Sequence, residues 1–64
     1  MAFICYIYPP IGRVPYMEVL DHATLEQAAD HARRLLRDRP DCDLAELYED
    51  DRPVAKIGRD EIAA

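Results

Sequence analysis

Residues 24–39, TLEQAADHARRLLRDR, form the segment around which the rest of the chain is organised. The apolar side chains of this segment recur with the period of an α-helix, about 100° per residue, and cover an arc of roughly 120°. The members of the arc are Leu25, Ala28, Ala29, Ala32, Leu35 and Leu36. The segment predicts a helix over residues 24–39 that rests on a core. Leu25, Leu35 and Leu36 are expected to be its large anchors.

The ends of this helix are marked by side-chain chemistry. Thr24 and Gln27 have the spacing of a capping box, in which a hydroxyl and an amide satisfy the first free N–H groups. Pro40 marks the stop, because the residue before a proline is disfavoured in a helix. Asp30 and Arg34 are four residues apart, a spacing that predicts an ion pair on the outer side.

The length of the chain predicts one α+β domain over residues 1–64. A chain of this size buries only about 60% of its unfolded surface, so a monomer is expected to be marginally stable and to need a staple or a partner. Thirteen acidic and eight basic residues give a net charge of −5, which opposes binding to phosphate backbones and anionic membranes.

The two cysteines, Cys5 and Cys42, are expected to be free thiols in a reduced, cytoplasmic protein. The apolar start, MAFICYIY, is too short for a membrane span or for the core of a signal peptide, and two prolines follow it. It therefore reads as a strand.

Residues 2–8 are apolar on both faces, which is typical of a central strand. In residues 14–21 we expect Met17 and Val19 to face the helix, with the remaining alternate residues on the opposite face. That opposite set is Tyr16, Glu18 and Leu20. Pro15 near the start of this segment favours an edge position, because proline cannot donate to a strand ladder.

Residues 43–49 and 53–58 predict a second hairpin after the helix. A three-residue turn at residues 50–52 would place Glu46 opposite Lys56 and would direct Ala45 and Leu47 toward the helix. A two-residue turn would instead put Lys56 beneath the helix, so the longer turn is preferred. The expected fold is a β-β-α-β-β chain with a four-stranded antiparallel sheet in the order 2-1-3-4 and one helix on one face.

The helix alanines, the Ala45-Glu46-Leu47-Tyr48 stretch and the Arg52-Pro53-Val54-Ala55-Lys56-Ile57 stretch together resemble a family of small uncharacterised bacterial proteins, common in alphaproteobacteria. The resemblance covers nearly the whole chain and implies this fold and length, with no activity to carry over. Tyr48 stands where such proteins often have tryptophan, and Asp51 where they often have a turn glycine. Thr24-Leu25-Glu26-Gln27-Ala28 is similar to the helix of an antitoxin family whose half-fold is related to double-stranded-RNA-binding domains.

The sharpest feature is that all four tyrosines are predicted on the sheet face away from the helix. Tyrosine offers a large apolar area with a polar tip, which suits an interface. The candidate interaction surface comprises Tyr6, Tyr8, Tyr16, Tyr48, Glu46 and Lys56. The same residues are also compatible with a wet sheet face that has scattered aromatic side chains.

No catalytic constellation, cofactor motif or metal motif is predicted. His22, His31, Cys5 and Cys42 carry metal-ligand atoms, but no two of them have the spacing of two to four residues typical of zinc sites. Both histidines are expected to be solvated. The thiol pKa of Cys42 is expected to be raised by its aspartate neighbours.

These observations predict a non-enzymatic protein that forms a homodimer and acts as a small interaction or regulatory module. The alternative is a nucleic-acid-binding or antitoxin-like module that uses the tyrosine-bearing face as a base-stacking platform. The negative charge of the chain, with Glu18 and Glu46 expected on that face, opposes this alternative.

Overall fold

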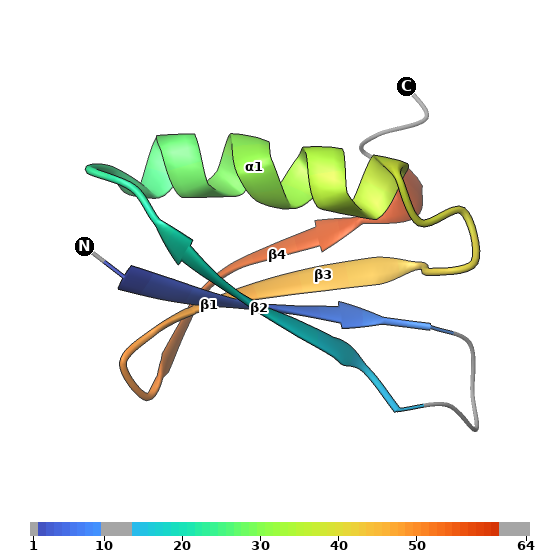
Figure 1. Cartoon of the computed structure of the whole chain (residues 1–64), viewed down its shortest axis with the longest axis horizontal. Coiled ribbons are helices and arrows are strands. Elements are labelled where there is room, and N and C mark those ends of the chain that lie inside the picture. The colour runs from blue at the N-terminus through green and yellow to red at the C-terminus, as the bar shows by residue number, and fades with distance from the viewer. Residues whose placement is uncertain (1, 10–13, 61–64) are drawn as a thin grey trace.

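The computed structural model describes residues 2–9 and 14–60 of the chain. Four strands and one helix follow in the order β1 (Ala2–Tyr8), β2 (Tyr16–Asp21), α1 (Leu25–Arg37), β3 (Leu44–Glu49) and β4 (Arg52–Gly58). The strands form one antiparallel sheet in the order β2-β1-β3-β4, with α1 along one face (Figure 1). The α+β fold and the strand order predicted from the sequence are confirmed.

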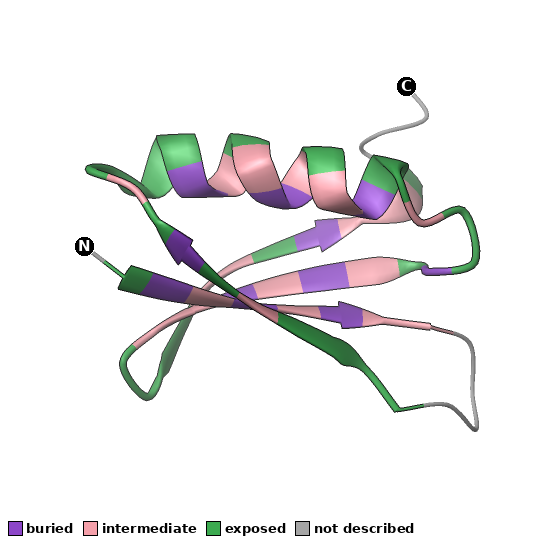
Figure 2. Ribbon diagram, in the orientation of Figure 1, coloured by how far each residue is buried: buried purple, intermediate pink, exposed green. Residues whose placement is uncertain are grey.

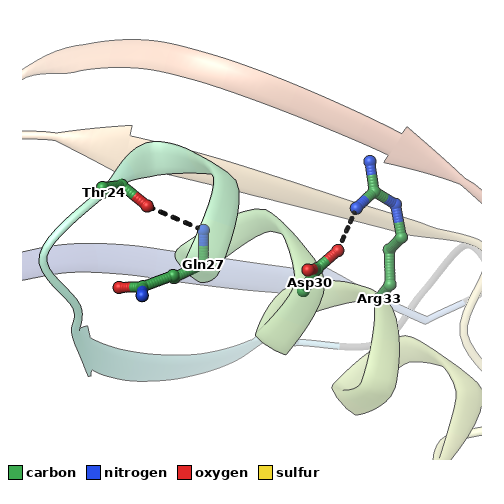
Figure 3. A network of polar contacts seen from close by, with 4 residues as sticks. All are labelled: Thr24, Gln27, Asp30 and Arg33. Atoms are coloured by element: carbon green, nitrogen blue, oxygen red, sulfur yellow. Dashed lines mark hydrogen bonds and ion pairs between the residues drawn. The ribbon is translucent and has the colours of Figure 1, made fainter.

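The helix is slightly shorter than the predicted range because its flanking residues serve as caps. The Thr24 hydroxyl accepts a hydrogen bond from the Gln27 N–H at 3.2 Å (Figure 3). The Gln27 Oε1 in turn accepts one from the Ala23 N–H at 3.2 Å. The helix ends at Arg37 with Asp38 as its C-cap. The predicted partner of Asp30 was wrong: the short ion pair, 2.7 Å, is made by Arg33 instead of Arg34 (Figure 3).

The hydrophobic core lies between α1 and the sheet face that α1 covers (Figure 2). The buried residues of the described chain are Phe3, Cys5, Ile7, Leu20, Ala28, Ala32, Leu36, Cys42, Ala45, Leu47 and Ile57. Three helix residues spaced four apart, Ala28, Ala32 and Leu36, supply the helical side of this core. Leu25 was expected to be an anchor, but its position in the first turn leaves it 41% exposed. Leu35 packs against the core and is partly buried.

The predicted orientation of the second strand was wrong. Leu20 lies opposite the buried Phe3, and Met17 lies opposite Tyr6, so Leu20 faces the helix while Met17 and Val19 face away from it. Both sets of alternate residues in this strand contain apolar side chains, so periodicity alone could not tell which set faces the helix. A slip of one residue in register moves every side chain to the other face, and here the pairing with β1 decides.

The turn between β3 and β4 was predicted one residue too long, yet the register it was meant to produce is present. Glu49 pairs with Arg52, which leaves two residues in the turn, and Asp50 has a positive φ of 55°. A register shift next to Leu47 and Tyr48 then inserts one extra residue in β4. This bulge restores the predicted Glu46–Lys56 pair and keeps Lys56 away from the helix.

Candidate interaction surface

The sheet face away from α1, called the open face below, has no element of the described chain packed against it (Figure 1). The strand registers place twelve side chains on it: Ala2, Ile4, Tyr6, Tyr8, Met17, Val19, Asp21, Leu44, Glu46, Tyr48, Pro53 and Lys56. Nine of these are aromatic or aliphatic. Met17 is 59% exposed and Val19 is 66% exposed. This face is therefore an exposed apolar patch that crosses all four strands.

Three tyrosines form the centre of the open face. Tyr6 meets Tyr48 edge to face, with ring centroids 5.3 Å apart, and lies 6.5 Å from the Tyr8 ring. Residues Tyr6 and Tyr8 alternate along β1, while Tyr48 comes from the neighbouring strand β3. Rings in mutual contact lose little side-chain freedom when they are covered, which is an advantage for an interface.

Glu46 is the acidic residue at the centre of the open face, and it is surrounded by groups that suit a carboxylate. It lies directly opposite Tyr6 on β1 and Lys56 on β4. The pKa of the Tyr8 hydroxyl is raised to about 12, first by desolvation and then by the hydrogen bond to Glu46 and the negative charge of that carboxylate. Tyr8 therefore stays protonated at neutral pH and can donate to Glu46.

The structure brings five of the six predicted surface residues together and separates the sixth. Tyr6, Tyr8, Tyr48, Glu46 and Lys56 share the open face, but Tyr16 lies opposite Ile7, on the face covered by α1. The prediction of four tyrosines on one face was thus wrong for Tyr16, for the same register reason as for Leu20. Sequence reasoning also missed Met17 and Val19, which it had placed under the helix.

Tyr16 instead belongs to a polar cluster at the end of α1. The Arg39 guanidinium lies 4.2 Å from the centre of the Tyr16 ring, and it is 3.7 Å from a carboxylate oxygen of Glu18. These contacts explain how a strand can direct Glu18 to the helix side: β2 is an edge strand, and Arg39 compensates the charge there. The cluster ties the connection after α1 to the edge of the sheet.

Arg59 holds the other side of that connection. Its guanidinium donates to the backbone carbonyl of Arg39 at 2.7 Å and to the carbonyl of Cys42. Arg59 lies in a segment without a strong sequence pattern, so this role was not predicted. Both carbonyls belong to the connection between α1 and β3, so Arg59 fixes this connection against the end of β4.

Both cysteines are free and buried. Burial, with a smaller contribution from Glu18, raises the pKa of the Cys5 thiol to about 11. The pKa of Cys42 is also raised, mainly by burial and then by Asp41, which confirms the predicted direction. Neither thiol therefore has the lowered pKa of a reactive nucleophile.

The two histidines contact each other, contrary to the expectation that both are solvated. His22 follows β2, His31 lies on α1, and their Nε2 and Nδ1 atoms are 2.8 Å apart. Within residues 2–9 and 14–60 there is no cluster of three or more His, Cys, Asp or Glu side chains that could hold a metal ion, and no pocket. No helix among these residues is long and apolar enough to cross a membrane.

Comparison with known proteins does not identify a relative of this chain. No protein-family model matches the chain, and neither the curated proteins nor the solved structures contain a significant match. The resemblance to the small bacterial family therefore stays a prediction, and functional inference depends on the surfaces described above.

Proposed function

We propose that this protein is a small, non-enzymatic interaction or regulatory module of the cytoplasm that acts as a homodimer, formed by packing the open faces of two copies together. The observation that supports this most directly is the tyrosine cluster of Tyr6, Tyr8 and Tyr48, surrounded by exposed aliphatic side chains. Contiguous apolar patches of this kind on small proteins mark contact surfaces. The free thiols of Cys5 and Cys42 are compatible with a reducing compartment.

The charge on the open face favours a second copy as the occupant. The chain as a whole carries −5, which makes two copies repel each other, but at the centre of the open face Glu46 is paired with Lys56, and Asp21 lies at the end of the edge strand β2. The centre of the face, where two copies would meet, therefore carries balanced charge. A two-fold axis through the face would also allow Lys56 of one copy to approach Glu46 of the other.

The size of the open face indicates a weak, concentration-dependent dimer. Seven residues of strand span about 23 Å and four strands span about 19 Å, which gives a plane on the order of 450 Å². Stable complexes bury about 800 Å² per partner. We therefore expect monomer and dimer to exchange, with the dimer populated at high protein concentration.

Solution mass measured by light scattering over a range of concentrations tests this proposal. The wild-type protein should shift from monomer toward dimer as concentration rises. The double variant Tyr6→Ser/Tyr48→Ser should stay monomeric, because it removes the edge-to-face pair at the centre of the patch. Tyr16→Ser is the matched control, since that tyrosine lies on the other face and its loss should leave the dimer intact.

Two results would overturn the proposal. One is a wild-type mass that stays monomeric at every concentration. The other is a dimer that Tyr16→Ser weakens as much as the double variant does, which would move the interface to the edge strand β2.

The alternative, a nucleic-acid-binding or antitoxin-like module, draws support from the same tyrosines, because bases stack on aromatic rings. The charges oppose it: Lys56 is the basic residue of the open face, while Arg33 and Arg39 are engaged with carboxylates elsewhere. Titration of labelled single-stranded RNA at low salt decides the matter. Binding that disappears in Tyr6→Ser/Tyr48→Ser would replace the dimer proposal.

A further inference from the structure

The two histidines of the chain, nine residues apart in sequence, are brought into direct contact by the fold. His22 lies in the connection between β2 and α1, and His31 lies on the second turn of α1. Their ring centroids are 5.1 Å apart and the rings are nearly perpendicular, at 80°. Both side chains are half-buried, so the pair lies at the surface with solvent access.

The two facing imidazole nitrogens are close enough to bind one metal ion between them. An N–H···N bond between imidazoles requires one nitrogen to donate and the other to be unprotonated, so one lone pair is already directed at its neighbour. If the donor ring moves this proton to its other nitrogen by exchange with water, both facing nitrogens carry a lone pair and both rings stay neutral. Imidazole nitrogens bind zinc at about 2.0–2.1 Å, which places two of them about 3.3 Å apart in a tetrahedral site. The observed separation of 2.8 Å needs only a small opening, and rotation of two surface side chains can provide it.

We propose that His22 and His31 together bind one divalent transition-metal cation of the class that prefers imidazole, such as Zn²⁺ or Ni²⁺. His22 would bind through Nε2 and His31 through Nδ1, the two atoms that now face each other. The described residues add no third ligand group of the required kind, so water completes the coordination shell. Two protein ligands imply modest affinity, and protons compete for the same nitrogens, so binding weakens as the pH falls.

The rest of the chain leaves this pair without strong competitors for such a cation. The sequence contains no other histidine. Cys5 and Cys42 are buried thiols with raised pKa values, so thiolate ligands are scarce at neutral pH. The net charge of −5 attracts cations in general, but it attracts Mg²⁺ as well as Zn²⁺. Preference for Zn²⁺ over Mg²⁺ is therefore the signature that separates imidazole binding from general attraction.

Binding would connect the β2–α1 loop to the body of the helix and so supply a staple to a chain of 64 residues whose cysteines are not cross-linked. A cation that binds the folded state better than the unfolded state raises the thermal midpoint with increasing concentration. The effect is independent of the open face, which lies on the other side of the sheet.

The test uses the full reduced chain in a buffer that does not chelate metals. Calorimetric titration with ZnCl₂ and with NiCl₂ should give one site per chain, and both salts should raise the melting temperature, whereas MgCl₂ should do neither. His22→Gln and His31→Gln should each weaken binding by about tenfold or more. In ¹⁵N spectra of the imidazoles, Nε2 of His22 and Nδ1 of His31 should be the nitrogens whose signals move.

Circular dichroism establishes that the variants are folded before binding is compared. The proposal is overturned if the wild-type chain shows neither heat nor a melting shift with Zn²⁺ or Ni²⁺. It is equally overturned if the double variant His22→Gln/His31→Gln binds as tightly as the wild type, since the cation would then be held by carboxylates.

Discussion

Leu47 and Leu44 lie three residues apart on the same strand, but on opposite faces of the sheet. Leu47 is fully buried on the face covered by α1, whereas Leu44 is half-buried on the open face, where it lies opposite Tyr8. The buried residues of the described strands all lie on the covered face. One face therefore supplies the core of a single copy, and the exposed apolar side chains of the other face are left to contact a second copy.

Truncation of each leucine should show the largest difference between the faces. Leu47→Ala removes a fully buried side chain and should cost about 2–5 kcal/mol of unfolding free energy, enough to unfold much of a domain this small. Leu44→Ala, the matched control, should cost well under half of that in the monomer, because its site is open to solvent. Urea unfolding at low protein concentration measures both. Equal losses would show that the open face contributes to the monomer as the covered face does.

The pH dependence of stability should show the second-largest difference between the two faces. Burial raises the pKa of Cys5 from 9.0 to about 11, so above pH 9 the unfolded chain releases this proton more readily than the folded chain. Stability should therefore fall as the pH rises from 9 to 11. On the open face, the pKa of Tyr8 is raised from 10.0 to about 12, so its deprotonation should extend the loss of stability to higher pH.

Variants separate these two contributions. Cys5→Ala should make the stability curve flatter between pH 9 and 11, and Tyr8→Phe should do so only above pH 10. The slopes are compared instead of absolute values, because Cys5→Ala also leaves a small cavity. If the pH dependence of the unfolding free energy is unchanged in Cys5→Ala, the loss of stability between pH 9 and 11 does not come from the buried thiol on the covered face.

Arg39 gives a smaller effect, at the boundary of the covered face. Arg39→Ala loses the contact with the Tyr16 ring and the ion pair with Glu18, and should cost about 1 kcal/mol. Arg34→Ala, on the exposed side of α1, should stay within about 0.5 kcal/mol of the wild type. Urea unfolding in low and high salt measures both, and salt should narrow the difference. Equal costs would indicate that the Tyr16 cluster contributes nothing beyond surface charge.

The smallest effect is expected in the turn that precedes β4. Asp50 has φ 55°, a conformation that costs an L-residue about 1 kcal/mol and glycine nothing. Asp50→Gly should therefore raise stability by about 0.5 kcal/mol after the added freedom of the unfolded chain is counted. Asp51→Gly should lower it slightly, because that residue has no positive φ to relieve. Thermal unfolding compares the two variants. A gain in stability from Asp51→Gly alone would contradict the placement of the backbone strain at Asp50.

The sequence alone determined the fold class, the strand order and the helix with its Thr24 cap, because each is encoded by local patterns. Helical periodicity over residues 24–39 is unambiguous, and a seven-residue strand that is apolar on both faces is typical of a central position. The same patterns placed five of the six candidate residues on the open face, because the tyrosine hydroxyls of β1 and β3 and the charges of Glu46 and Lys56 favour the solvent-facing side.

Features that depend on pairing between distant segments follow from the tertiary structure instead. The face of Tyr16, the exposure of Met17 and Val19, and the bulge in β4 follow from register, which alternation cannot specify when both parities are apolar. The His22–His31 contact joins a loop to a helix turn nine residues away, outside the spacing that marks metal motifs. Local sequence sets periodicity, but side chains on different elements meet only where packing of the whole chain brings them together.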